Sequence, residues 1–224
     1  RVRLIETAQI GAGASGGLVG ALSPHVPENW NDKKAFQLES LLMAESWWHQ
    51  VALASGLRPG YARSGRLQPL ADATAVDLAQ RRAETARDLW QGHATWQVLR
   101  APADAWQPAS PSGWLVKDTL SARLHPRMAA AALVAAIRSG GGDLILGTGA
   151  DEGPVIWATG HAGLLDLSDD QGRVVGDGVK GQAILLRHDA RPLPQLFVDG
   201  LHIVPHEDGT VAVGSTSEHH WTDP

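Results

Sequence analysis

The chain has 224 residues, 43% of them hydrophobic and 19% charged, with a formal net charge of -5. This is enough for one large domain or two small interlocked ones. The negative balance gives no sign of a polyanion-binding surface, so nucleic acid is not an expected partner. The sequence has no cysteine, which excludes disulfides and thiolate chemistry. It has no apolar run of about 18 residues and no recognisable signal peptide, so we expect no membrane span and a cytoplasmic location.

The N-terminal half begins with a strand over residues 2–5 that ends at Glu6. Asn31 or Asp32 can cap a helix that runs to about residue 54, where Gly56 stops it. A strand over 65–70 and a polar helix over 73–89 follow. The stretch 101–112, rich in proline and alanine, is expected to be a loop.

The C-terminal half begins with a helix that opens at His125-Pro126 and ends at the glycines 140–142. The short apolar segments 143–146 and 155–158 are typical of buried strands in a parallel sheet. Further strands are expected over 182–187, 201–204 and 211–214, the last two joined as a hairpin around Asp208-Gly209. The pattern therefore predicts a mixed α/β fold, with an α/β half and an antiparallel sheet whose elements alternate along the chain.

The stretch Gly11-Ala12-Gly13-Ala14-Ser15-Gly16 fits the dinucleotide pattern G-x-G-x-x-G, in which glycines bring backbone close to a pyrophosphate. That pattern should follow its strand directly and open a helix. Here four residues follow Glu6 first, and Pro24 comes too soon for a helix. The alternative makes residues 1–6 the second strand of such a fold, with Glu6 accepting hydrogen bonds from ribose hydroxyls.

Five blocks, in order along the chain, resemble the D-amino-acid oxidase and glycine oxidase superfamily of flavoenzymes. They are Leu4-Ile5-Glu6 with Gly13-Ala14-Ser15-Gly16-Gly17 and Gly20-Ala21-Leu22; Leu124-His125-Pro126-Arg127; Val155-Ile156-Trp157-Ala158-Thr159-Gly160; Val179-Lys180-Gly181-Gln182; and His202-Ile203-Val204-Pro205 with Asp208-Gly209 and Val213-Gly214-Ser215-Thr216. In that family the phosphate loop lies before the strand-end acid, so we expect it to precede residue 1. The arginine that clamps the substrate carboxylate in relatives lies beyond the last block.

The resemblance implies an incomplete Rossmann-like FAD-binding domain interleaved with an antiparallel-sheet substrate domain. Residues 1–55 and 119–170 would form the FAD-binding domain, and residues 56–118 and 171–224 the substrate-binding domain. Small residues let backbone N–H groups reach phosphate or flavin oxygens. The cofactor-binding positions implied are Glu6, Thr7, Ala14, Ser15, Gly16, Gly20, Ala21, Ala158, Thr159 and Gly160.

The resemblance further implies oxidation of a C–N bond in a small amine or amino acid, by hydride transfer to FAD and reoxidation by oxygen to hydrogen peroxide. The protein then positions the substrate, and no metal is needed. His202 stands where relatives have a substrate-facing tyrosine, and His206 where they have an arginine. His202 is therefore the first candidate to face the substrate, with His25 near the site entrance as the second. A homo-oligomer is compatible with the sequence.

Two other functions stay open. Gly13-Ala14-Ser15-Gly16, residues 20–24 and Gly113-Trp114-Leu115 also resemble the FAD-dependent domain of the bacterial tRNA wobble-uridine modification enzyme. That domain acts on a carboxymethylaminomethyl group, and the net charge of -5 counts against an RNA substrate. A noncatalytic FAD-binding module is the alternative of a different class.

Overall fold

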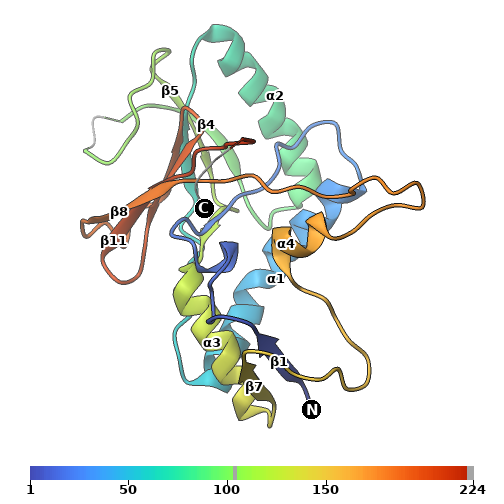
Figure 1. The fold of residues 1–224 in the computed structure, drawn as a ribbon. Helices are drawn as coiled ribbons and strands as arrows, with labels where there is room; N and C mark the ends of the chain where they lie inside the picture. The colour runs from blue at the N-terminus through green and yellow to red at the C-terminus, as the bar shows by residue number, and fades with distance from the viewer. Residues whose placement is uncertain (103–104, 221–224) are drawn as a thin grey trace.

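The structure, a computed structural model, describes residues 1–102 and 105–220 and has a mixed α/β fold. Figure 1 shows a small parallel sheet with its helices at one end of the molecule and a large sheet at the other. The predicted fold class is therefore confirmed. No helix in the described ranges is both long and apolar enough to cross a membrane.

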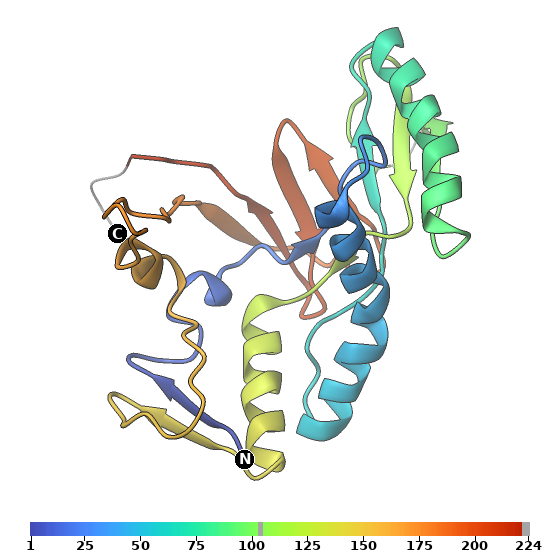
Figure 2. The same cartoon turned by 90° about the vertical axis from the view of Figure 1, so that its right-hand side faces the viewer.

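The parallel sheet contains two strands, β1 (Arg3–Glu6) and β7 (Asp143–Leu146), in register from Arg3 opposite Asp143 to Glu6 opposite Leu146. Both were predicted. Figure 2 shows α3 (Pro126–Ser139) lying between this sheet and α1 (Asp32–Ser55). Proline occupies the first turn of α3, where its missing N–H costs nothing.

The large sheet has the strand order β4-β5-β3-β9-β10-β11-β8. Neighbouring strands are antiparallel except β3 and β9, which run parallel. The strands are β3 (Arg66–Pro69), β4 (Trp96–Arg100), β5 (Trp114–Asp118), β8 (Ala183–Arg187), β9 (Gln195–Val198), β10 (Leu201–Pro205) and β11 (Thr210–Gly214). The hairpin predicted around Asp208-Gly209 is confirmed as β10–β11.

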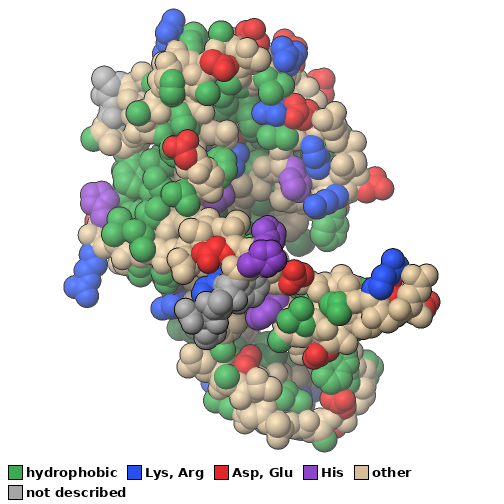
Figure 3. All heavy atoms as spheres, turned by 45° about the horizontal axis from the view of Figure 1, so that its top comes forward, with side chains coloured by type: hydrophobic (Ala, Val, Ile, Leu, Met, Phe, Trp, Pro, Cys, Tyr) green, Lys and Arg blue, Asp and Glu red, His purple; other side chains and the backbone are tan. Residues whose placement is uncertain are grey.

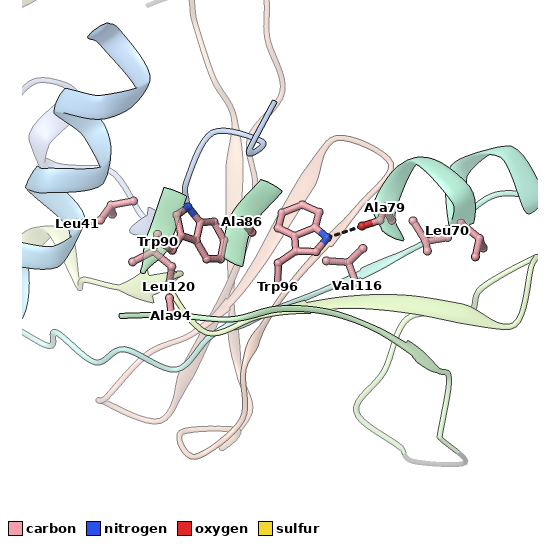
Figure 4. Close-up of a cluster of buried hydrophobic side chains, with 10 residues drawn as sticks. Leu41, Leu70, Ala79, Ala86, Trp90, Ala94, Trp96, Val116 and Leu120 are labelled. Carbon is pink, nitrogen blue, oxygen red and sulfur yellow. Dashed lines mark hydrogen bonds between the residues drawn. The ribbon is translucent and has the colours of Figure 1, made fainter. Parts of the chain in front are cut away.

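The helices begin and end near the predicted residues because their caps are local. The side chain of Asn31 accepts from the Lys34 N–H at 3.1 Å, and Gly56 ends α1 in the left-handed conformation with φ 69°. The side chain of Asp72 caps α2 (Ala73–Trp90) in the same way. Figure 4 shows the core beneath α2, where Trp96 donates its indole N–H to the Ala79 carbonyl at 3.1 Å.

The prediction of a strand over residues 155–158 is wrong. This segment is irregular and unpaired, with Ile156 92% and Trp157 74% exposed. A strand needs a neighbour to take its backbone hydrogen bonds, and none of the described residues lies beside it as one. A short helix that was not predicted, α4 (Gly160–Leu165), follows. The short pair β2 (Ala21–Leu22) and β6 (Ala122–Arg123) was not predicted either.

Candidate flavin and substrate site

Glu6 ends β1 with its carboxylate already oriented. Its Oε1 accepts the backbone N–H of Ala8 at 2.9 Å, and the side chain is half-buried. The other carboxylate oxygen has no hydrogen-bond partner among the described residues and can accept from a ligand. Thr7, next along the chain, is exposed.

The glycine stretch forms a single 3₁₀ turn, η1 (Ala14–Gly16), and the next regular element is the two-residue strand β2. No α-helix opens at Gly16, so the literal G-x-G-x-x-G interpretation lacks the helix N-terminus that it requires. We call residues 11–20 the small-residue loop.

Three hydrogen bonds fasten the small-residue loop to the rest of the fold. Arg127 donates from Nε to the Gly16 carbonyl at 2.9 Å, and the Leu124 N–H donates to the Gly20 carbonyl at 2.8 Å. His206 donates from Nε2 to the Leu18 carbonyl at 2.8 Å. The loop is therefore held from the start of α3 on one side and from the β10–β11 hairpin on the other.

The glycines of this loop have a packing role of their own. A Cβ on Gly16 would lie 1.8 Å from the Gly11 carbonyl oxygen, and one on Gly20 would lie 1.5 Å from the Leu124 carbonyl oxygen. By contrast, Ala14 and Ser15 are exposed, and their backbone N–H groups have no acceptor among the described residues. These donors and the Ser15 hydroxyl suit a ligand that carries oxyanions, as FAD does.

Ala158, Thr159 and Gly160 are all exposed where the chain enters α4. Figure 2 shows α4 on the same side of α3 as β1 and the small-residue loop, and away from α1. No hydrogen bond among the described residues joins these three positions to Glu6 or to η1. Ala21, in β2, is half-buried.

His202 lies on the face of the large sheet that turns toward the small-residue loop. It stands opposite Phe197 on β9 and Gly214 on β11, and the His202 and Phe197 rings are 4.7 Å apart. Side chains two residues apart share a strand face. Val204 and then His206 therefore continue this row, and His206 contacts Leu18.

Burial lowers the pKa of His202 below its ordinary value of 6.5, and the nearby charge of Arg66 lowers it further. The imidazole is therefore neutral at pH 7. Its Nδ1 is buried without a hydrogen-bond partner. A neutral ring with one unpaired nitrogen can donate to or accept from a substrate.

The sequence does not single out Arg66, which the fold brings to the same face. Arg66 on β3 is buried, donates from Nε to Asp118 Oδ2 at 3.1 Å, and holds its guanidinium 5.7 Å from the centre of the Phe197 ring. The sequence feature that could have identified Arg66 is its position inside a short predicted strand. A charged residue is rarely buried, so an arginine there is unusual.

His25 lies apart from this row. Its backbone N–H donates to Gln37 Oε1 on α1 at 2.6 Å, and its side chain is half-buried. Among the described residues, no hydrogen bond, ion pair or ring contact links His25 to His202.

Two open pockets lie away from these residues. One, of about 520 Å³, is lined by Ile10, Leu57 and one side of α3, and the other, of about 420 Å³, lies at the N-terminus of α2. Neither includes His202 or Arg66. On the face seen in Figure 3, acidic and basic side chains are interspersed rather than gathered by sign.

The comparisons with known proteins point in one direction. A family model described as FAD dependent oxidoreductase (DAO) matches residues 1–224. Glycine oxidase from Geobacillus kaustophilus has a similar structure, with a TM-score of 0.74 and 20% identity over 100% of this chain and 66% of that one. Iminodiacetate oxidase from Chelativorans sp. BNC1 follows with a TM-score of 0.64, 20% identity, and 97% and 65% covered.

L-proline dehydrogenase from P. horikoshii is also similar, with a TM-score of 0.67, 15% identity, and 99% and 65% covered. The chain thus spans about two thirds or slightly less of each of these three proteins. No curated protein sequence matches it significantly. At these identities the solved structures show a shared fold.

Proposed function

Because the chain belongs to the DAO family of FAD-dependent oxidoreductases, we propose that it oxidises the C–N bond of a small amine or amino acid. Bound FAD would supply the acceptor for the electron pair and return it to oxygen as hydrogen peroxide. The solved neighbours named glycine oxidase, iminodiacetate oxidase and L-proline dehydrogenase support a substrate of this class. A homo-oligomer is compatible with this proposal and is not required by it.

We infer that the FAD is held along β1, the small-residue loop and the entry to α4. Glu6 and Thr7 would bind the ribose, and the N–H groups and hydroxyl around η1 would bind oxyanions of the cofactor. The remaining positions would lie against the cofactor without a side-chain contact: Gly16, Gly20, Ala21, Ala158, Thr159 and Gly160. The division into an FAD-binding part (1–55 and 119–170) and a substrate-binding part (56–118 and 171–224) is proposed on the same grounds.

The observation that carries the proposal is the row of side chains beginning at His202 on the sheet face turned toward the small-residue loop. A neutral imidazole with an unpartnered Nδ1 can hold the polar group of an amine substrate in one orientation. Phe197, packed against that imidazole, fixes the ring plane and excludes water from one side of it. In this proposal His202 orients the substrate and Phe197 excludes water from the imidazole.

The direct test is reduction of the flavin. FAD-loaded protein is mixed anaerobically with glycine, sarcosine, D-amino acids or modified tRNA, and loss of flavin absorbance is followed. Admission of oxygen should then restore the absorbance and release one equivalent of peroxide. Bleaching only by the tRNA would favour the tRNA-modifying reaction. A flavin that binds but is reduced by none of the panel would favour a noncatalytic module.

Substitution of His202 tests its part in substrate selection. His202→Ala should raise the KM of the best amine substrate at least about tenfold, roughly 1.4 kcal/mol, because a hydrogen bond to the substrate is lost. His202→Tyr should shift the preference toward simple amino acids such as glycine. His25→Ala is the matched control and should change KM much less. An unchanged KM and substrate ranking in both His202 variants would contradict the assignment.

A further inference from the structure

His206 connects the large sheet to the small-residue loop. It directly follows β10, its side chain is 0% exposed, and its Nε2 donates to the Leu18 carbonyl at 2.8 Å. The other two hydrogen bonds that fasten this loop come from Leu124, just before α3, and from Arg127 in the first turn of α3. His206 is thus the link from the β10–β11 hairpin to the loop along which we place the FAD.

A second histidine, His125, packs against His206 from the start of α3. It is 8% exposed, and the two rings lie 4.7 Å apart. Its Nδ1 accepts the Met128 N–H at 3.4 Å, so the neutral ring carries its proton on Nε2. That Nε2 lies 3.4 Å from Asp208 Oδ2, in the turn of the hairpin. The hairpin, the small-residue loop and α3 therefore meet at His125, His206 and Asp208.

This junction suits a neutral His206. Its Nδ1 is buried with no hydrogen-bond partner in the described ranges, so a second proton there would have no acceptor. Burial lowers the pKa of His206, and the neighbouring His125 and Arg123 act in the same direction. The Leu18 carbonyl and Asp208 act in the opposite direction but do not reverse the shift. A protonated His206 is therefore better accommodated when the junction opens and water reaches the ring.

We propose that His206 is a positioning residue for FAD: the neutral ring fixes the small-residue loop against the large sheet, and the protonated ring releases the loop and weakens FAD binding. This inference rests on the proposed function, because it requires that FAD lies along the loop. His202 and His206 stand in one row of the sheet face, so the bond to Leu18 also sets the loop's position relative to the proposed substrate-facing histidine. By linkage, FAD binding and protonation of His206 oppose each other equally.

The coupling is tested by the Kd of FAD at pH 7.5 and pH 5.5, measured by flavin fluorescence titration of the full-length protein. The parent's Kd should rise at least about threefold in acid, within the limit of about tenfold per pH unit for one titrating group. His206→Gln keeps an amide donor for the Leu18 carbonyl but does not titrate, so its Kd should be nearly the same at both pH values. His49→Gln, at an exposed position on α1, should follow the parent.

A second measurement needs no FAD. Residues 1–224 contain no cysteine, so a spin label on Ala14→Cys, in the exposed part of the loop and in a protein free of other cysteines, reports the motion of the loop. In the FAD-free protein this label should become more mobile between pH 7.5 and pH 5.5, and His206→Gln should remove the increase. A label on Gln50→Cys, at an exposed position on α1, should be equally mobile at both pH values.

The two measurements separate this inference from the proposed function. An unchanged Kd in the parent, or an equal rise in His206→Gln shown to be folded by thermal melting, overturns the coupling while FAD binding stands. Absence of FAD binding at either pH overturns the proposed function, and the spin label then decides whether protonation of His206 releases the loop. Equal mobility of the Ala14→Cys label at the two pH values overturns that release as well.

Discussion

At the scale of single residues, Glu6 is the carboxylate that we propose binds the ribose of FAD. One carboxylate oxygen is held by the Ala8 N–H, which leaves the other to accept from hydroxyls. Glu6→Gln should therefore weaken FAD by about 1.5–3 kcal/mol, the worth of charge-assisted hydrogen bonds. Flavin fluorescence titration measures the Kd. Glu152→Gln, an exposed carboxylate paired with Arg3, is the control. An unaltered Kd in Glu6→Gln at equal thermal stability would place Glu6 outside the site.

His202 was a candidate site residue from the sequence alone, whereas Arg66 was not. His202 follows from its place in a family block and from strand alternation, both readable in the sequence. Arg66 gains its importance from Asp118, which lies 52 positions away along the chain, and from Phe197 on the neighbouring strand β9. No local pattern encodes those contacts, because strand register between distant segments is a property of the folded sheet.

At the scale of elements, the small-residue loop has exposed residues at Ala14 and Ser15 and a close backbone contact at Gly20. Gly20→Ala would place a methyl 1.5 Å from the Leu124 carbonyl oxygen, so β2 and β6 must separate. We expect a loss of about 1–3 kcal/mol or more in the free energy of unfolding, measured by urea denaturation. Gly13→Ala is the matched control, since a methyl there would have nothing within 4 Å of it. Equal stability of both variants would contradict the packing role.

Helices and strands were predicted correctly where the residues that determine them lie close together in the sequence. The helices were found because their caps and stop residues are adjacent in sequence, as at Asn31 and Gly56. Strands β4, β5 and β9 were not predicted. In β5 and β9 the buried polar residues Asp118 and Gln195 break the apolar pattern. The prediction for residues 155–158 failed for the opposite reason. Their composition favours a strand, but a strand must also pair with a neighbouring strand, and composition does not show whether one is present.

At the scale of the whole molecule, the large sheet meets the small-residue loop at His206. The His206 side chain is 0% exposed, donates to the Leu18 carbonyl and lies 4.7 Å from the His125 ring. Three side chains act on its charge: His125 from the start of α3, Asp208 from the hairpin and Arg123 from β6. A neutral imidazole suits this position, because a second proton on Nδ1 would be buried without an acceptor.

The stability of the whole chain should therefore decrease as the pH falls below 6.5. Burial is the main cause that lowers the pKa of His206 below that value in the folded state, and the same holds for His202. Between the folded and unfolded pKa values the unfolded chain binds more protons, so acid favours unfolding. The stabilisation is fully present above about pH 6.5 and is lost toward the folded pKa, with a slope of at most about 1.4 kcal/mol per pH unit for each histidine.

Urea unfolding at pH 7.5 and pH 5.5 measures this difference in a range above the titration of ordinary carboxylates. His206→Gln keeps an amide donor for the Leu18 carbonyl but removes the titrating group, so its free energy of unfolding should fall less between the two pH values. His49→Gln, at an exposed position on α1, should keep the parent's pH dependence. If the free energy of unfolding of His206→Gln fell between the two pH values as much as that of the parent, protonation of His206 would not be the cause of the loss of stability in acid.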